Sequence, residues 1–139
     1  STSIRIAAFM AACDLISENF VFGTGQGDVI ACMKEKMHER VGEDYSGTCA
    51  PHNQFLRSFA SFGILGFLFD VLLVVVMFRL SIRSKDKVFL WWTISTLIFF
   101  VTEDMLCIIN GIVFFSMFTA FFMNYWQQNP CPSQKNDVS

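Results

Sequence analysis

Three stretches of the sequence are long and almost free of charge. Residues 59–78 hold one charged side chain in twenty, Asp70, whereas residues 88–102 hold none in fifteen and residues 105–125 none in twenty-one. A helix that crosses a hydrocarbon core of ~30 Å needs about 20 apolar residues. The first and third stretches meet that length, and the second meets it if its charged flanks lie at the two interfaces. The pattern predicts three membrane helices, with a re-entrant hairpin as the alternative for the second.

We therefore expect an all-α fold with multi-pass transmembrane helices, preceded by an extracytoplasmic helical segment. The segment comprises residues 1–54, the membrane region residues 55–124, and a disordered tail residues 125–139. Within the membrane region, helices are predicted at about 57–80, 87–103 and 105–124. Because the chain begins at Ser1 rather than Met, we expect it to be a piece of a longer protein.

The charges between these helices predict their orientation. Residues 79–87 contain four basic side chains and one acid, which is typical of a short cytoplasmic loop. The turn at 102–104 contains two acids and no base, which is typical of the outer side. Residues 1–54 should then lie outside, in the periplasm of a Gram-negative cell, and the tail should return to the cytoplasm.

The outer segment shows helical periodicity. A first helix is predicted from a cap at Ser1 or Ser3 to about Asn19, and a second from about Asp28 to Val41. Their apolar faces would be Ile4, Ala8, Ala11, Leu15 and Ile16 in the first, and Val29, Met33, Met37 and Val41 in the second. The other faces of the second helix are highly charged and are predicted to be solvated.

Composition narrows the class of protein. Hydrophobic residues make up 53% and charged residues 16%, and the mean hydropathy is +0.47. These values exclude a disordered chain and a basic nucleic-acid-binding domain. They leave a very apolar soluble domain or a membrane protein, and the charge-free stretches favour the membrane protein. The net charge of −2 identifies no partner.

The cysteines predict neither a disulfide framework nor a metal site. The five of them are scattered, odd in number and without a CxxC pair. Cys32 and Cys49 could pair if the outer segment faces an oxidising compartment.

A glycine-rich segment follows the first predicted helix, with glycines at Gly23, Gly25 and Gly27. It lacks the preceding strand and the spacing of a dinucleotide-binding loop, so we reject that interpretation. Two alternatives stay open. One is a tight turn that needs positive φ, and the other is a loop whose bare amides approach an anionic ligand.

Two residues of the outer segment carry candidate chemistry. His52 lies where this segment enters the first membrane helix, and could accept a proton, pair with phosphate or serve only as a polar anchor. Asn53 and Gln54 beside it could orient the ring or a sugar hydroxyl. Arg5 is the single cation of the first 33 residues and could bind phosphate oxygens, or pair instead with a nearby acid, Asp14 or Glu18.

Acidic side chains within or beside the membrane helices are further candidates. Asp70 would be neutral, face a polar cavity or pair with another helix, because a charge at that depth costs about 2.5–3.5 kcal/mol. Glu103 and Asp104 could be a solvated turn or the rim of a site. No other metal ligands converge on them in the sequence.

Several segments together resemble the C-terminal half of the O-antigen ligase and polymerase superfamily over about residues 1–123. In order, these are the Arg-bearing helix, NFVFGTGQGDV at 19–29, PHNQFL at 51–56 and FGILG at 62–66. TEDML at 102–106 and GIVFF at 111–115 look like the Bacteroidetes-type version. The chain departs from that version after residue 106, where an acid or other polar group is expected and Cys107 stands.

The resemblance implies a multi-pass glycosyltransferase of the bacterial inner membrane that uses a glycan on undecaprenyl diphosphate. A ligase would transfer the glycan to a lipid A core acceptor, and a polymerase would join repeat units on the carrier. Such an enzyme acts among membrane lipids without nucleic acid, nucleotide sugar, cofactor or metal. The fragment would pack against N-terminal helices and be inactive without them.

The resemblance also implies roles for individual residues. Arg5 and His52, 47 positions apart, match the family's functional arginine and histidine. Arg5 would hold the diphosphate, and His52 would activate the acceptor hydroxyl or contact the diphosphate. Residues expected to contribute to substrate binding are Asn53, Gly23, Gly25, Gly27, Glu103 and Asp104. Two other classes remain: a non-catalytic membrane module that binds a partner through the outer segment, including Met33 and Met37, and a transporter with Asp70 as its ion site.

Overall fold

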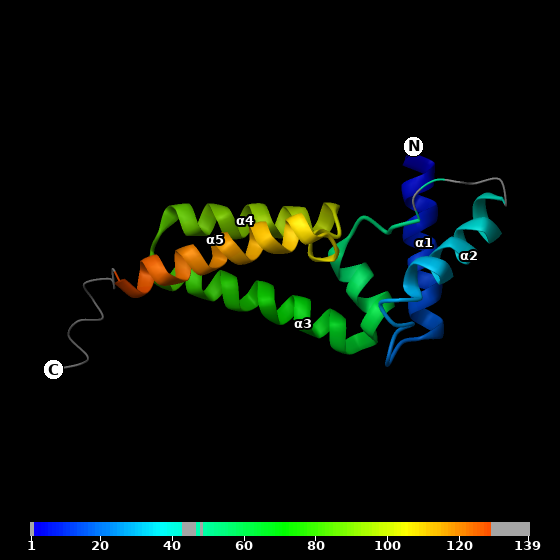
Figure 1. The fold of residues 1–139 in the computed structure, drawn as a ribbon, viewed down its shortest axis with the longest axis horizontal. Helices are drawn as coiled ribbons and strands as arrows, with labels where there is room; N and C mark the ends of the chain where they lie inside the picture. Colours follow the sequence, from blue (N-terminus) through cyan, green and yellow to red (C-terminus); the bar gives the residue numbers. More distant parts are fainter. Residues whose placement is uncertain (1, 43–46, 48, 129–139) are drawn as a thin grey trace.

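The computed structural model describes residues 2–42, 47 and 49–128, and this part of the chain contains helices and no strand (Figure 1). The all-α prediction is confirmed. The elements are α1 (Thr2–Glu18), α2 (Val29–Val41), α3 (Gln54–Ser84), α4 (Lys87–Thr102), the 3₁₀ turn η1 (Met105–Cys107) and α5 (Ile109–Gln128). The disordered tail predicted at 125–139 is wrong at residues 125–128, which continue α5, and its part from residue 129 onward lies outside the described residues.

Helix ends differ from the prediction where local capping decides them. α3 continues to Ser84, so most of the predicted basic loop is helical and the chain reverses at Lys85, which has a φ of 55°. The Asp86 carboxylate then caps α4 by accepting from the Val88 amide at 2.8 Å. The last helix begins at Ile109 rather than at residue 105, because the chain first forms the η1 turn.

A kink at Gly63 divides α3 into two arms. Gly63 has φ 65° and ψ −154°, a conformation outside the helical region that glycine adopts without steric cost. The short arm lies beside α1, and the long arm runs along α4 (Figure 1). The sequence did not predict this kink, which joins an outer layer (α1, α2 and the short arm of α3) to an apolar bundle (the long arm, α4 and α5).

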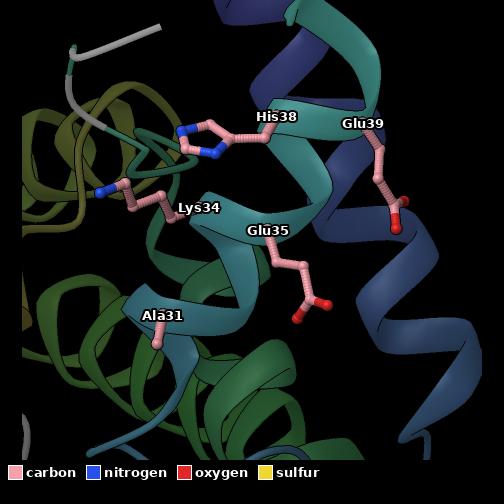
Figure 2. A pocket seen from close by; sticks show the side chains of 5 residues that line it. All are labelled: Ala31, Lys34, Glu35, His38 and Glu39. Atoms are coloured by element: carbon pink, nitrogen blue, oxygen red, sulfur yellow. The ribbon is translucent and has the colours of Figure 1, made fainter. Parts of the chain in front are cut away.

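The charged face of α2 is partly solvated, as predicted. Figure 2 shows Lys34, Glu35, His38 and Glu39 along this face, where they line a surface pocket. Two other cations of α2 bind acids of α1. The Lys36 ammonium contacts the Glu18 carboxylate at 2.8 Å, and the Arg40 guanidinium pairs with Asp14. Hydrogen bonding to Glu18 raises the pKa of Lys36.

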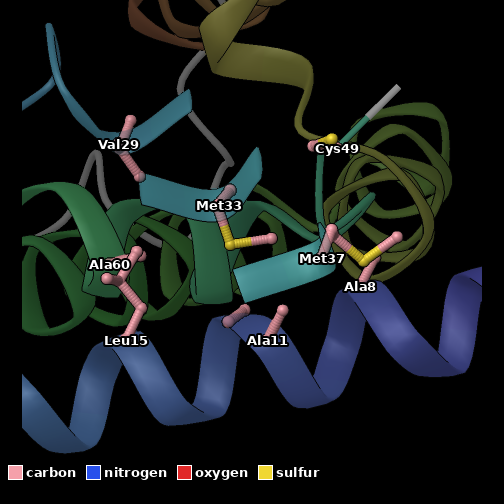
Figure 3. Close-up of a cluster of buried hydrophobic side chains, with 9 residues drawn as sticks. Ala8, Ala11, Leu15, Val29, Met33, Met37, Cys49 and Ala60 are labelled. Carbon is pink, nitrogen blue, oxygen red and sulfur yellow. The ribbon is translucent and has the colours of Figure 1, made fainter. Parts of the chain in front are cut away.

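The apolar faces of α1 and α2 meet in the core of the outer layer (Figure 3). Its buried members are Ala8, Ala11, Ala12, Leu15, Val29, Met33, Met37, Cys49 and Ala60. The predicted faces are therefore confirmed, except at Val41, which ends its helix and is 44% exposed. Cys49 packs in this core and Cys32 against it, and both thiols are free.

The apolar bundle has a smaller core made largely of aromatic rings. Phe89 stacks on Phe122 with ring centroids 5.1 Å apart, and Trp92 on Phe118 at 4.9 Å. Most other apolar side chains of the bundle are exposed. Among the described helices, α3 is the one long and apolar enough to cross a membrane, whereas α4 and α5 are apolar but shorter. The multi-pass prediction is therefore not confirmed.

Candidate functional site

The glycine-rich loop clamps the kink of α3. The Thr24 amide donates to the Ala60 carbonyl at 2.9 Å, the Gly25 amide donates to the Ser61 carbonyl at 2.8 Å, and the Ile64 amide donates to the Phe20 carbonyl at 3.0 Å. These bonds satisfy backbone groups that the break in the helix leaves without intrahelical partners. The loop thus holds the short arm of α3 at a fixed angle to the long arm.

Close backbone contact explains two of the glycines. A Cβ on Gly23 would lie 2.5 Å from the Gly63 nitrogen, and one on Gly63 would overlap the Val21 carbonyl. The amides of Gly23 and Gly25 are both bound within the chain, the former to the Asn19 carbonyl at 2.9 Å. Gly23 and Gly25 therefore form a tight turn, and their amides are not free to bind an anion. A ligand contact at Gly27 stays a prediction.

His52 is held between the outer layer and the bundle. Its φ of 47° is in the left-handed region, which is uncommon outside glycine and occurs most often at turns and functional sites. Asn53 follows as the N-cap of α3: its Oδ1 accepts from the Leu56 amide at 3.1 Å, and its Nδ2 donates to the Val101 carbonyl at 3.0 Å. Asn53 therefore ties the start of α3 to the end of α4, and this tie sets the position of His52.

The imidazole of His52 is paired with a carboxylate. His52 Nδ1 lies 3.0 Å from Glu103 Oε2, and both side chains are partly exposed. When the carboxylate accepts the Nδ1 proton, the neutral ring presents Nε2 as a proton acceptor. A carboxylate in this position also stabilises the imidazolium that forms when Nε2 takes up a proton. The pair therefore has the composition of a general base.

Arg5 lies in the same pocket as His52. The pocket, of about 430 Å³, is lined by Arg5, Ile6 and Phe9 of α1, by Pro51, His52 and Asn53, and by Val101 and Thr102. The acids predicted as alternative partners of Arg5 are bound to other cations, Asp14 to Arg40 and Glu18 to Lys36. Within the described ranges no acid pairs with Arg5. Two residues 47 positions apart thus bring a guanidinium and a base to one pocket.

Asp104 joins His52 and Glu103 in a small cluster. One ligand atom from each of the three lies within 4.8 Å of the others, so together they could hold a divalent cation. Asp104 is nearly buried, and its carboxylate does not cap η1. Clusters of carboxylates at a turn are common without a metal, and Glu103 already has a hydrogen-bond partner in His52.

A second cavity, of about 460 Å³, lies inside the angle of α3 and contains Arg57, a residue the sequence analysis missed. Arg57 stands two residues before the first charge-poor stretch of the sequence. Asp70 lines this cavity, which agrees with one of the three predicted possibilities, that it faces a polar cavity. Gln54 Nε2 donates to Asp70 Oδ2 at 3.3 Å, and Gln54 Oε1 accepts from the Leu106 amide at 2.9 Å.

Comparison with protein-family models finds a match to the first part of the chain. Residues 1–71, just over half of the 139-residue chain, match the model described as O-antigen ligase. No curated protein and no solved structure matches the chain. The matched range contains Arg5, the glycine-rich loop, His52, Arg57 and the kink of α3.

Proposed function

The chain belongs to the O-antigen ligase family, and we propose that the pocket of Arg5 and His52 is the catalytic site of a glycosyltransferase. Membership assigns the chain to membrane-associated lipopolysaccharide biosynthesis and to ligase or polymerase activity in general, without specifying the substrates. The finer proposal is transfer of a glycan from undecaprenyl diphosphate to a hydroxyl of a lipid A core acceptor. The observation that carries it is the presence of Arg5 and His52 in one pocket, with the His52 ring paired to the Glu103 carboxylate.

The three side chains divide the work of the transfer. His52 Nε2 accepts the proton of the acceptor hydroxyl as its oxygen bonds to the anomeric carbon of the donor sugar. The bond from that carbon to the diphosphate breaks, and the diphosphate leaves with the electron pair. Arg5 stabilises the negative charge that develops on the leaving group, and Glu103 stabilises the protonated imidazole of His52.

The fold supports a membrane location for this site. The long arm of α3 is apolar and exposes much of its surface, and α4 and α5 expose apolar faces beside it. We propose that all three lie in the inner membrane, that residues 1–54 lie in the periplasm, and that the chain packs against N-terminal helices of the same protein. The pocket of Arg5 and His52 would then lie at the outer surface of the membrane, where α1 meets the ends of α3 and α4.

The other classes of function find less support in the structure. Met33 and Met37, the residues proposed to contact a partner in a non-catalytic module, are fully buried in the core of the outer layer. Asp70, the proposed ion site of a transporter, is hydrogen-bonded to Gln54. A polymerase of the same superfamily would use the same donor and differ from a ligase in its acceptor. The pocket of Arg5 and His52 is therefore compatible with both enzymes.

The test replaces His52 or His38 of this chain, one at a time, within the full-length protein. We expect His52→Ala to abolish the lipopolysaccharide ladder on gels while the amount of protein in the membrane stays normal, because the base is lost. His38→Ala, on the surface of α2, is the matched control and should leave the ladder intact. A normal ladder in the His52→Ala strain would overturn the catalytic assignment.

Deletion of the whole gene separates ligase from polymerase. A ligase deletion loses all attached chains and accumulates polymer on the carrier. A polymerase deletion leaves single repeat units attached to the lipid A core.

A further inference from the structure

Arg57 is a buried cation without a partner for two of its nitrogens. Its residue is 4% exposed, and Nε and Nη1 have no hydrogen-bond partner among the described residues. A buried charge without a partner is strongly unfavourable, and guanidinium groups in such positions bind carboxylates or phosphates. The unpaired donors therefore point to a ligand that the fold is built to receive.

The cavity around Arg57 has a polar end and an apolar wall. Its polar lining consists of Gln26, Gln54, Arg57, Ser58, Asp70 and Cys107. Its apolar wall contains Phe62, Leu65, Phe69 and Leu106, and the side chains of the first three are exposed. The kink makes both possible, because the short arm supplies Arg57 and the long arm supplies Phe69 and Asp70.

The polar end offers complementary contacts to two kinds of group. The two free guanidinium donors of Arg57 match phosphate oxygens. The Asp70 carboxylate and the amide of Gln26 match hydroxyl groups such as those of a sugar. Asp70 is already bound to Gln54, so the described contacts do not place it on Arg57. The apolar wall matches a hydrocarbon chain.

We propose that this cavity binds the phosphate-bearing head of a lipid, as a second anion site beside the pocket of Arg5 and His52. The two cavities share no lining residue, yet both begin at the start of α3, where His52 and Asn53 face one and Gln54 and Arg57 the other. Resting on the proposed function, this second lipid would be the phosphorylated acceptor, with its hydrocarbon chain on Phe62, Leu65 and Phe69.

The test measures how many phosphate-headed lipids the full-length protein binds in phosphatidylcholine nanodiscs. Farnesyl phosphate is the probe, and farnesol and inorganic phosphate are the two comparison ligands. We expect two sites in the wild type, and one in Arg57→Gln. Arg79→Gln, an exposed arginine near the far end of α3, is the control and should retain both sites. Equal binding of farnesol, or equal binding of inorganic phosphate at the second site, would overturn the proposal.

Arg57→Lys keeps the test decisive if Arg57→Gln fails to fold. Lysine retains the charge but cannot form a bidentate contact, so affinity at one site should fall about tenfold. Unchanged stoichiometry and affinity in either folded variant would mean that another part of the protein neutralises Arg57. The binding experiment does not depend on glycan transfer. An intact ladder in the His52→Ala strain would contradict the proposed catalytic site but not the second lipid site, and unchanged lipid binding in the Arg57 variants would contradict the second site but not the catalytic one.

Discussion

The outer layer and the apolar bundle stabilise their helices in different ways. In the outer layer, α1 and α2 bury a continuous core of alanine, methionine and leucine, and their charges form ion pairs at its edge. In the bundle, a few rings are buried and most apolar side chains face outward. The first pattern is that of a domain that folds in water, and the second needs lipid or further helices to cover it. Both candidate sites lie where the two patterns meet.

The joint between the regions should be the most sensitive position. Gly63→Ala would place a Cβ on the Val21 backbone at a positive φ, so we expect a loss of about 3 kcal/mol or more, measured as a lower melting temperature in detergent. Gly25→Ala, which also has a positive φ but open space around it, should lose about 1–2 kcal/mol. Gly27→Ala is the control. If Gly63→Ala and Gly27→Ala had the same melting temperature, the kink would not couple the two regions.

The core of the outer layer should be next. Met33→Ala removes a fully buried side chain and should destabilise the protein by about 2–5 kcal/mol. Leu72→Ala, on the long arm of α3, changes a side chain that is 60% exposed and should cost less than about 1 kcal/mol. The measurement is again thermal unfolding of the purified protein. Equal losses at the two positions would contradict the difference drawn between the layer and the bundle.

Cysteine reactivity gives the smallest and most local test of the same layer. Burial raises the pKa of the Cys49 thiol, so at a given pH it carries less thiolate than an ordinary cysteine. Cys13 is exposed on α1. At pH 8 we expect iodoacetamide to label Cys13 at least about tenfold faster, measured by mass spectrometry of peptides. Equal rates in the folded protein, with equal rates also after denaturation, would show that Cys49 is not buried.

The sequence could predict what depends on local periodicity and on motifs. The helical period of Ala8, Leu15, Val29 and Met33 gave both outer helices and their buried faces, because each face packs directly on the other. The resemblance singled out Arg5, His52 and Asn53, which line one pocket in the structure, but not the other lining residues. Their convergence depends on the fold, since α1 and the end of α4 are brought together only by the packing of both against α3.

The remaining features depend on contacts between distant segments. The kink at Gly63 exists because the loop at 20–25 supplies hydrogen bonds to the broken helix, and a glycine within an apolar stretch does not reveal such a partner. Arg57 is buried and lines a cavity together with Leu106 and Cys107 of η1, which lie about 50 positions away in the sequence. Its position beside an apolar stretch does not show whether its side chain is buried, because burial depends on the tertiary structure.

The most direct test of the central claim measures glycan transfer by the purified full-length protein with Arg5→Gln, His52→Gln and both changes together. If the two residues act as one site, each single change should lower kcat/KM by about 100-fold or more. The loss of kcat/KM in the double variant should then be far smaller than the product of the two single losses. A single variant within about threefold of the wild type would contradict the account.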